Sequence, residues 1–247
     1  RPDFKSSTVT KSIGELLKTV QNRITTRAIM RDRNLKMCGA SSRNNISAGF
    51  HVHFGLPEFL LRGNPDTPWL MSNIAKVLDY YVGIPSIIPE GIEDNRRRSA
   101  RFSQYGKPGD HRADILTLEY RVPGGHLLRH PILTEGLLSI SRLVMKDMLS
   151  RMQSYSNNFR MPRIFASYEE LRNLYPKLPN REEVLKAITS ESINMATTHI
   201  GSMLEDLSKM IGFEENKNSI LPYMNYLVEF ITGKNKFAED INTNWRL

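Results

Sequence analysis

Two histidines separated by one residue lie in a short run of aromatic and β-branched residues, SAGFHVHFGLP, at positions 47–57. Because successive side chains of a β-strand point to opposite faces, His51 and His53 are expected to share one face. The apolar residues on the other face are Phe50, Val52 and Phe54. Glycines bound the run and Pro57 prevents further ladder pairing, which favours a strand over a helix. The two histidines either belong to a ligand site or are solvated on an edge strand. So short a motif indicates a site only when other ligand-binding residues lie near it.

A second group of charged residues lies in EDNRRRSARFSQYGKPGDHRADILTLEYRVPGG, residues 93–125. Its glycine-containing turn, YGKPG, is surrounded by arginines: Arg96, Arg97, Arg98, Arg101 and Arg112. Guanidinium groups bind phosphate oxygens in a bidentate fork, and glycine lets a backbone approach a ligand closely. The pattern therefore favours a polyphosphate ligand, and for Arg96 to Arg98 the alternative is a solvated basic loop.

The alternating run LTLEYRVP predicts a strand with Glu119 and Arg121 on one face. Such a strand offers a carboxylate for a cation beside a guanidinium for an anion. Together with the two histidines, it supplies the groups that a metal–nucleotide site needs: imidazole and carboxylate for Mg²⁺ or Mn²⁺, and arginines for phosphate groups. We therefore expect the two strands to present these four side chains on a common face.

Helical periodicity surrounds the two strands and predicts the elements that must position them. Apolar residues recur at helical spacing in residues 8–26, 67–82 and 130–152, and again in 181–211 and 219–232. Helix breaks are expected at Pro162, Pro176 and Pro179. We expect an α+β core over residues 1–155 and a helical C-terminal extension over residues 156–247, in which no chemical motif is visible.

Composition narrows the classes of protein. The chain has 247 residues, 40% of them hydrophobic, and its longest apolar stretches are interrupted by charges or asparagine, so we expect no membrane partner. The single cysteine, Cys38, excludes an intramolecular disulfide and is typical of a reducing compartment. A formal net charge of +8 favours anionic partners. Nucleic acid is disfavoured, because the basic run lacks interleaved aromatic residues and lies beside a carboxylate-bearing strand.

The two motifs also resemble a known family. AGFHVHFG, followed by R-x3-YG-x2-G-x2-R and then by LEYRVPGG, is similar to the carboxylate-amine ligases of the glutamine synthetase and glutamate-cysteine ligase superfamily. The chain most resembles the phage-encoded amidoligases called COOH.NH2 ligase type 2. The stretch VLDYYVGIPSII, residues 77–88, resembles the segment that this family places between the motifs, and the similarity covers roughly residues 1–145.

The resemblance implies a fold, a reaction and a set of site residues. The fold would be a curved antiparallel sheet with helices packed on one side, as in the catalytic fold of glutamine synthetase, and with the site in the concave face. ATP and Mg²⁺ or Mn²⁺ would be the cofactors, and a carboxylate and an amine, free or in peptides, would be joined through an acyl phosphate. The implied metal ligands are His51 and Glu119. The implied nucleotide and phosphate ligands are His53, Arg101, Tyr105, Gly106, Arg112 and Arg121, of which Arg112 and Arg121 would also contact the acyl phosphate.

The chain departs from the family pattern before residue 47. The family places an acidic strand early, and nothing in this part of the chain fits it, so we expect the N-terminal strands of that fold to be missing or supplied by another segment or phage protein. Two hypotheses follow: an active ligase, or a non-catalytic virion or assembly protein that keeps the ligase scaffold. Either would place the protein in the host cytoplasm or in the virion.

Overall fold

The computed structural model describes residues 49–57, 60, 67–90, 98, 106–113, 116–156, 165–189, 193–234 and 241–245. The chain divides into two units, Arg1–Ser47 and Ala48–Leu247, and every described residue belongs to the second. The helix expected over residues 8–26 therefore lies outside the described residues.

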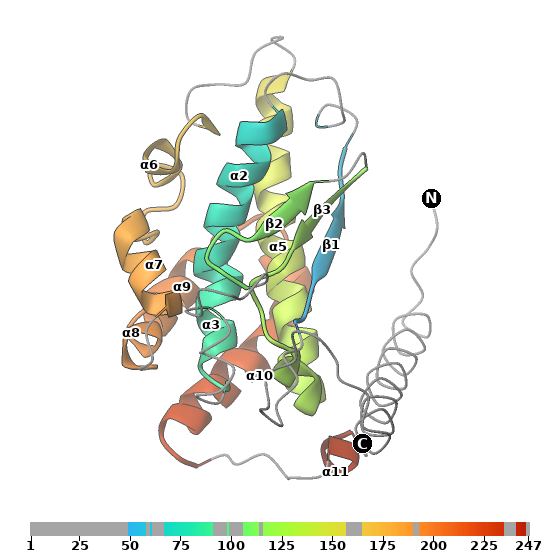
Figure 1. Cartoon of the computed structure of the whole chain (residues 1–247), viewed down its shortest axis with the longest axis vertical. Coiled ribbons are helices and arrows are strands. Elements are labelled where there is room, and N and C mark those ends of the chain that lie inside the picture. Colours follow the sequence, from blue (N-terminus) through green and yellow to red (C-terminus); the bar gives the residue numbers. More distant parts are fainter. Residues whose placement is uncertain are drawn as a thin grey trace, which may run out of the picture. The chain divides into compact units, whose positions relative to one another are not determined.

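The described sheet has three antiparallel strands in the order β1-β3-β2 (Figure 1). Their bounds are Val52–Gly55 for β1, His111–Ala113 for β2 and Thr117–Tyr120 for β3. The two predicted strands are confirmed, although His51 lies just before β1 and Arg121 just after β3. Strand β2 was not predicted, because three residues within a charged stretch carry no readable alternation.

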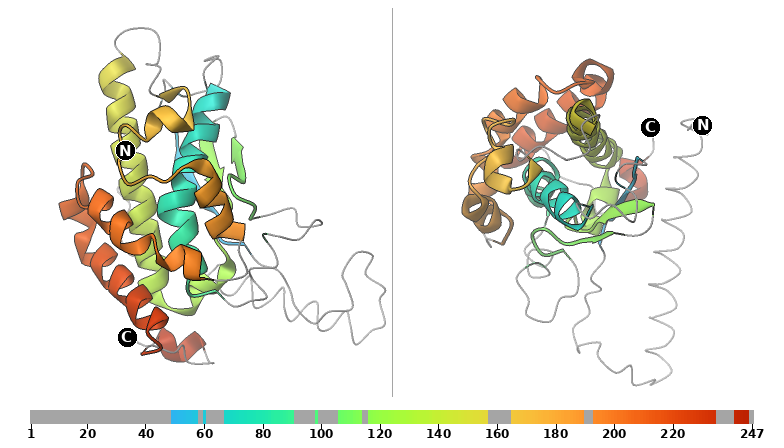
Figure 2. Two further views of the ribbon diagram at one scale, coloured as in Figure 1. Left: turned by 90° about the vertical axis from the view of Figure 1, so that its left-hand side faces the viewer. Right: turned by 90° about the horizontal axis from the view of Figure 1, so that it is seen from above.

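The sheet has one buried face, which explains why these residues form strands. Val52 lies opposite Tyr120, and Phe54 lies opposite Leu118. Leu118 and Tyr120 are fully buried and Val52 is nearly so, whereas the residues between them are not buried. Figure 2 shows α2 (Thr67–Leu78) and α5 (Pro131–Ser156) on the same side of the sheet, and α2 packs against β2 and β3. We call this the inner face and the opposite one the outer face.

A nearly continuous helical rod packs next to the sheet. The helix expected over residues 67–82 is α2, which continues through a widened turn, η2 (Asp79–Gly83), into α3 (Ile84–Ile87). The inner positions predicted from periodicity are all fully buried: Leu70, Ile74, Val77, Leu78 and Tyr81. Pro85 has no N–H and its ring crowds the carbonyl four residues earlier, so the wide turn just before it lets the helix continue.

Of the remaining helices, α9 (Ile200–Leu207) and α10 (Phe213–Ile231) pack against α5, and α7 (Arg181–Thr189) and α8 (Asn194–Thr197) pack against α3. As predicted, α5 opens at Pro131. The helix expected over residues 181–211 is three shorter ones, namely α7, α8 and α9. The helix expected over 219–232 is α10, which contains Pro222 and packs along α5. The short elements are the 3₁₀ turn η3 (Gly125–Arg129), α6 (Tyr168–Leu171) and α11 (Ile241–Asn244). Pro176 and Pro179 lie in the connection between α6 and α7, as predicted, and Pro162 lies outside the described residues.

The α+β class is confirmed at this level: a small open antiparallel sheet joined to a mostly helical body. The glutamine synthetase-like curvature and the boundary after residue 155 stay predictions. In the part of the chain that the structure describes, no helix combines the length and the apolar character needed to cross a membrane.

Candidate metal and nucleotide site

Polar side chains form two rows across the outer face of the sheet. In the first row, Glu119 of β3 lies opposite His53 of β1 on one side and opposite Arg112 of β2 on the other. Residues directly opposite each other in a sheet point to the same face, so these three side chains share the outer face. The second row contains His51 and Arg121, and the Arg121 N–H donates to the Asp110 carbonyl oxygen at 3.0 Å.

Glu119 is the centre of this arrangement. Its Oε1 lies 2.7 Å from Nδ1 of His51, 3.5 Å from Nε of Arg121 and 3.9 Å from Nε2 of His53. The Glu119 side chain is 13% exposed, whereas that of His53 is 58% exposed. One carboxylate oxygen therefore joins three cationic or ionisable groups at the sheet surface, as the period-two alternation of both runs predicts.

Burial favours the neutral form of His51. Partial burial lowers the pKa of His51 below its ordinary value of 6.5, and Arg121 lowers it further, while Glu119 opposes both effects. A neutral imidazole beside a carboxylate donates its Nδ1–H to it. Because a metal ligand must be deprotonated, a cation shared by His51 and Glu119 would replace this proton. Nε2 lies against Gly49, where a methyl group added to the glycine would be 2.7 Å away. The imidazole thus occupies space that exists because residue 49 has no side chain.

A glycine turn supports the second row. Gly106 and Gly109 adopt φ values of 85° and 78°, which residues with a side chain rarely adopt. The Gly106 N–H donates to Oδ2 of Asp110 at 2.8 Å, and Oδ1 of Asp110 lies 3.8 Å from Nη1 of Arg121. Because its N–H already binds Asp110, Gly106 would contribute to a nucleotide site through its lack of a side chain. Asp110 was not singled out in the sequence, although it directly follows the conspicuous turn.

The structure brings together five of the residues selected from the sequence: His51, His53, Arg112, Glu119 and Arg121. Gly106 lies in the adjoining turn. Arg101 and Tyr105 lie outside the described residues, as do Arg96 and Arg97. Their assignment to a nucleotide wall stays a prediction.

Arg98 is neither solvated nor on the outer face. It is 2% exposed, forms an ion pair with the buried Glu90, and donates from Nε to the Ile188 carbonyl oxygen at 3.1 Å. Glu90 also lies 3.2 Å from Nδ1 of the buried His126. Arg98 is therefore part of the interior. The phosphate-binding role that the pattern favoured for it is wrong, and so is the alternative of a solvated basic loop.

The residues present fit a divalent cation in part. His51 and Glu119 offer an imidazole nitrogen and a carboxylate, a donor pair that Mn²⁺ accepts and that Mg²⁺ tolerates through the carboxylate. Among the described residues, no three histidine, cysteine, aspartate or glutamate side chains are grouped to hold a metal ion. A cation bound by this pair would take its other ligands from elsewhere, such as water or phosphate oxygens.

The described part of the protein thus has an α+β fold whose sheet presents imidazoles, a carboxylate and guanidiniums on one face. Comparison with known families gives one match: the family described as phage phiEco32-like COOH.NH2 ligase type 2 matches residues 1–194. The chain belongs to this family, which confirms the resemblance and extends it past residue 145 to include α7. Neither the curated proteins nor the solved structures compared with the chain gave a match.

Proposed function

We propose that this protein is an ATP-dependent ligase that requires Mg²⁺ or Mn²⁺ and joins a carboxylate to an amine through an acyl phosphate. The observation that carries the proposal is the position of Glu119, which lies within 2.7 Å of His51 and 3.5 Å of Arg121 on a single face. A cation ligand thus adjoins an anion ligand, and the family name describes a ligase that joins COOH and NH2 groups.

Each residue of the outer face has a role in this proposal. His51 and Glu119 hold the cation, which when bound would neutralise charge on phosphate oxygens. Phosphate oxygens are bound by His53, Arg112 and Arg121, whose donors point to the same face. The nucleotide and substrate wall would include Arg101, Tyr105 and Gly106.

The reaction proceeds in two displacements. A substrate carboxylate oxygen attacks the γ-phosphorus of ATP, the bond to the β,γ-bridging oxygen breaks, and ADP leaves. The amine nitrogen then attacks the activated carbonyl carbon, inorganic phosphate leaves with the bonding pair, and the nitrogen loses a proton to give the amide. Phosphoryl transfer depends mainly on positioning and charge stabilisation, so the guanidinium of Arg121 contributes by binding the developing charge.

Trapping of the acyl phosphate tests this function. The protein is incubated with ATP, Mn²⁺, a panel of amino acids and peptides, and hydroxylamine, which converts an acyl phosphate into a coloured hydroxamate. We expect hydroxamate and ADP in equal amounts with at least one carboxylate, and their loss in Arg121→Gln but not in Arg142→Gln, an exposed arginine on α5. Hydroxamate formation that survives Arg121→Gln would overturn the site assignment.

The second candidate is a non-catalytic phage virion or assembly protein that retains the scaffold. The observation that favours it is the small donor set, since no third metal-binding side chain joins His51 and Glu119 among the described residues. In that case Glu119 and Arg121 would act as a structural ion pair. The trapping assay would then give no hydroxamate with any carboxylate, and the phage particle would contain the protein.

A further inference from the structure

We propose that Asp79 and Arg181 are positioning residues that hold the outer-face site from the buried side of the sheet, so that α7 is part of the site's architecture. This inference rests on the proposed function and adds residues to it that touch neither substrate nor cofactor. It arises from a buried carboxylate that the proposed chemistry does not use.

Asp79 connects three segments that are distant in the sequence. Its carboxylate, which is fully buried in η2, accepts a hydrogen bond from the Tyr120 hydroxyl at 2.8 Å and forms an ion pair with Nη2 of Arg181 at 2.6 Å. Gly109 packs against this ion pair: a methyl group added to it would lie 3.3 Å from Nη2 of Arg181 and 3.8 Å from Oδ2 of Asp79. Asp79 thus binds strand β3 and the first residue of α7, and lies against the glycine turn.

Two of these partners are immediate neighbours of site residues. Tyr120 lies between Glu119 and Arg121 on β3, with its side chain on the inner face and theirs on the outer face. Gly109 precedes Asp110, whose carbonyl oxygen accepts from the Arg121 N–H. Asp79 therefore fixes the position of β3 and of the glycine turn from the buried side of the sheet. This in turn orients Glu119, Arg121 and Asp110 on the outer face.

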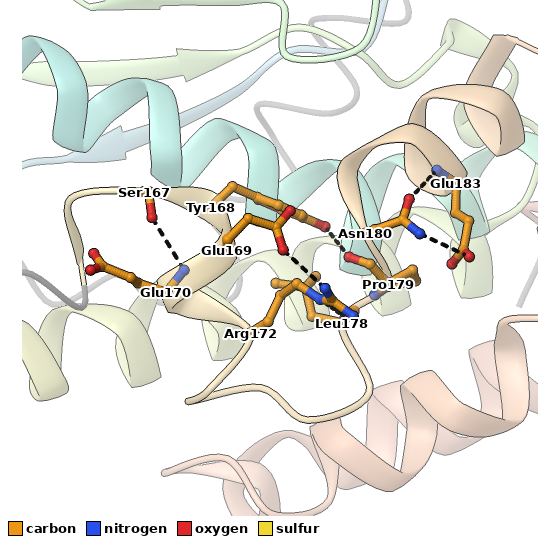
Figure 3. Close-up of polar contacts among 9 residues, drawn as sticks. All are labelled: Ser167, Tyr168, Glu169, Glu170, Arg172, Leu178, Pro179, Asn180 and Glu183. Carbon is orange, nitrogen blue, oxygen red and sulfur yellow. Dashed lines mark hydrogen bonds and ion pairs between the residues drawn. The ribbon is translucent and has the colours of Figure 1, made fainter.

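The segment that leads into α7, just before Arg181, is fixed by several hydrogen bonds (Figure 3). Asn180 and Glu183 cap each other at the start of α7: the Glu183 N–H donates to Oδ1 of Asn180 at 2.9 Å, and Nδ2 of Asn180 donates to Glu183 at 3.0 Å. The Tyr168 hydroxyl donates to the Pro179 carbonyl oxygen at 3.0 Å. Nε of Arg172 donates to the Leu178 carbonyl oxygen at 3.1 Å, which closes the loop before Asn180.

The ring of Tyr168, in α6, makes a second contact with Arg181. Its guanidinium carbon lies 5.8 Å from the centre of the Tyr168 ring, a separation suited to a cation–π interaction. Arg181 is thus fixed by the ring of Tyr168 and by the carboxylate of Asp79. The Arg181 side chain therefore has little conformational freedom on the buried side of the sheet, as a positioning residue requires.

The energetics of buried ion pairs indicate that Asp79 and Arg181 pair to fix the geometry of the sheet rather than to stabilise the fold. Burial raises the pKa of Asp79, and Arg181 opposes that shift. Replacing a buried ion pair with well-packed apolar residues is often neutral or stabilising, whereas removing one partner is strongly destabilising. A carboxylate in the otherwise apolar segment VLDYYVG is therefore explained by the geometry it imposes on β3 and the turn. The family match covers residues 1–194 and therefore includes Arg181 and the whole of α7.

The first measurement reports on the hydrogen bond from His51 to Glu119. The imidazole of His51 donates to Glu119, so its Nδ1 proton gives a downfield nuclear magnetic resonance signal that can be assigned by its loss in His51→Gln. We expect this signal to shift or disappear in Arg181→Gln and in Tyr120→Phe, which removes a single hydroxyl and is the milder change. Arg181→Lys keeps the charge and is expected to restore the signal in part. Lys186→Ala, at an exposed position on α7, should leave it unchanged.

Binding of Mn²⁺–ATP gives the second measurement. We expect a loss of about 10- to 100-fold in Arg181→Gln, the usual effect of removing a group that orients a ligand. An unchanged His51 signal in Tyr120→Phe and Arg181→Gln, with only a lower unfolding midpoint, would overturn the inference and leave a purely structural ion pair. Failure of the proposed function is distinguishable, because the parent would then bind no nucleotide while the His51 signal still responded to Arg181→Gln.

Discussion

Nδ1 of His51 lies 2.7 Å from Oε1 of Glu119, which joins the residue just before β1 to the middle of β3. The contact forms on the outer face of the sheet, beside Arg121, and the side chains on the inner face are buried. A hydrogen-bonded imidazole and carboxylate keep each other in a fixed orientation, so this pair defines the place where a cation is expected to bind.

The two histidines are predicted to differ in function. His51→Ala removes a proposed cation ligand and should weaken Mn²⁺ binding in the absence of nucleotide by at least tenfold, or about 1.4 kcal/mol. His53→Ala removes an exposed side chain 3.9 Å from Glu119 and should mainly weaken ATP binding. Titration calorimetry with Mn²⁺ and with ATP separates the two effects, and equal losses in both variants would contradict the roles assigned.

Gly49 is predicted to be required for the position of His51. In Gly49→Ala the new methyl group would lie 2.7 Å from Nε2 of His51, so the imidazole must move and the contact to Glu119 should weaken. Gly55→Ala is the matched control, since a methyl group on Gly55, in β1, meets no atom within 4 Å. Mn²⁺ affinity should fall in the first variant and remain unchanged in the second. If both variants bind Mn²⁺ like the parent, the close approach has no functional meaning.

The elements whose residues alternate or repeat could be predicted from the sequence. The alternation of apolar and polar residues placed Glu119 on the face shared with the two histidines, because a sheet with one buried face fixes which residues point outward. The helical spacing from residue 67 onward identified the buried side of α2 for the same reason.

Pairing between distant segments could not be predicted in this way. Strand β2 is too short and too charged to show a period, so the position of Arg112 opposite Glu119 became visible only in the structure. The ion pair of Asp79 with Arg181 joins residues from two different helical segments, and a single sequence does not indicate such partners. The available signal was a carboxylate in an otherwise buried segment, which needs a partner somewhere in the fold.

Among the polar residues of the helices, Asp147 is predicted to contribute most to the free energy of unfolding. Its buried carboxylate accepts hydrogen bonds from the Tyr175 hydroxyl at 2.8 Å and from the Ile211 N–H at 2.9 Å, and pairs with Arg151 at 2.7 Å. Asp147→Ala leaves these donors without their acceptor and should lower the free energy of unfolding by about 3 kcal/mol or more. Urea denaturation measures this loss. Glu215→Gln, which breaks an exposed pair with Lys146, should change little, and a similar effect of both substitutions would contradict the prediction.

Stability is predicted to fall as the pH drops below about 6.5. Burial lowers the pKa of His130 below its ordinary value of 6.5, and its Nδ1 accepts a hydrogen bond from the Ile132 N–H at 3.2 Å at the start of α5. Above pH 6.5 the residue is neutral in both states. Below it, the unfolded chain takes up the proton first, so stability is lost until the pH reaches the folded-state pKa.

The contribution of His130 can be isolated by substitution. His130→Asn keeps a side-chain acceptor for the Ile132 N–H but does not titrate. Urea midpoints of the parent and the variant, compared at pH values of about 7.5 and about 5.5, should show a smaller pH dependence in the variant. Identical pH dependence in both proteins would show that His130 does not contribute.

Calorimetric titration of Mn²⁺–ATP into the parent, Arg121→Gln and Arg142→Gln tests most directly the claim that the outer face is a metal–nucleotide site. We expect saturable binding to one site in the parent, affinity lower by about tenfold or more in Arg121→Gln, and parent-like affinity in Arg142→Gln. Absence of binding in the parent, or equal affinity in all three proteins, would contradict it.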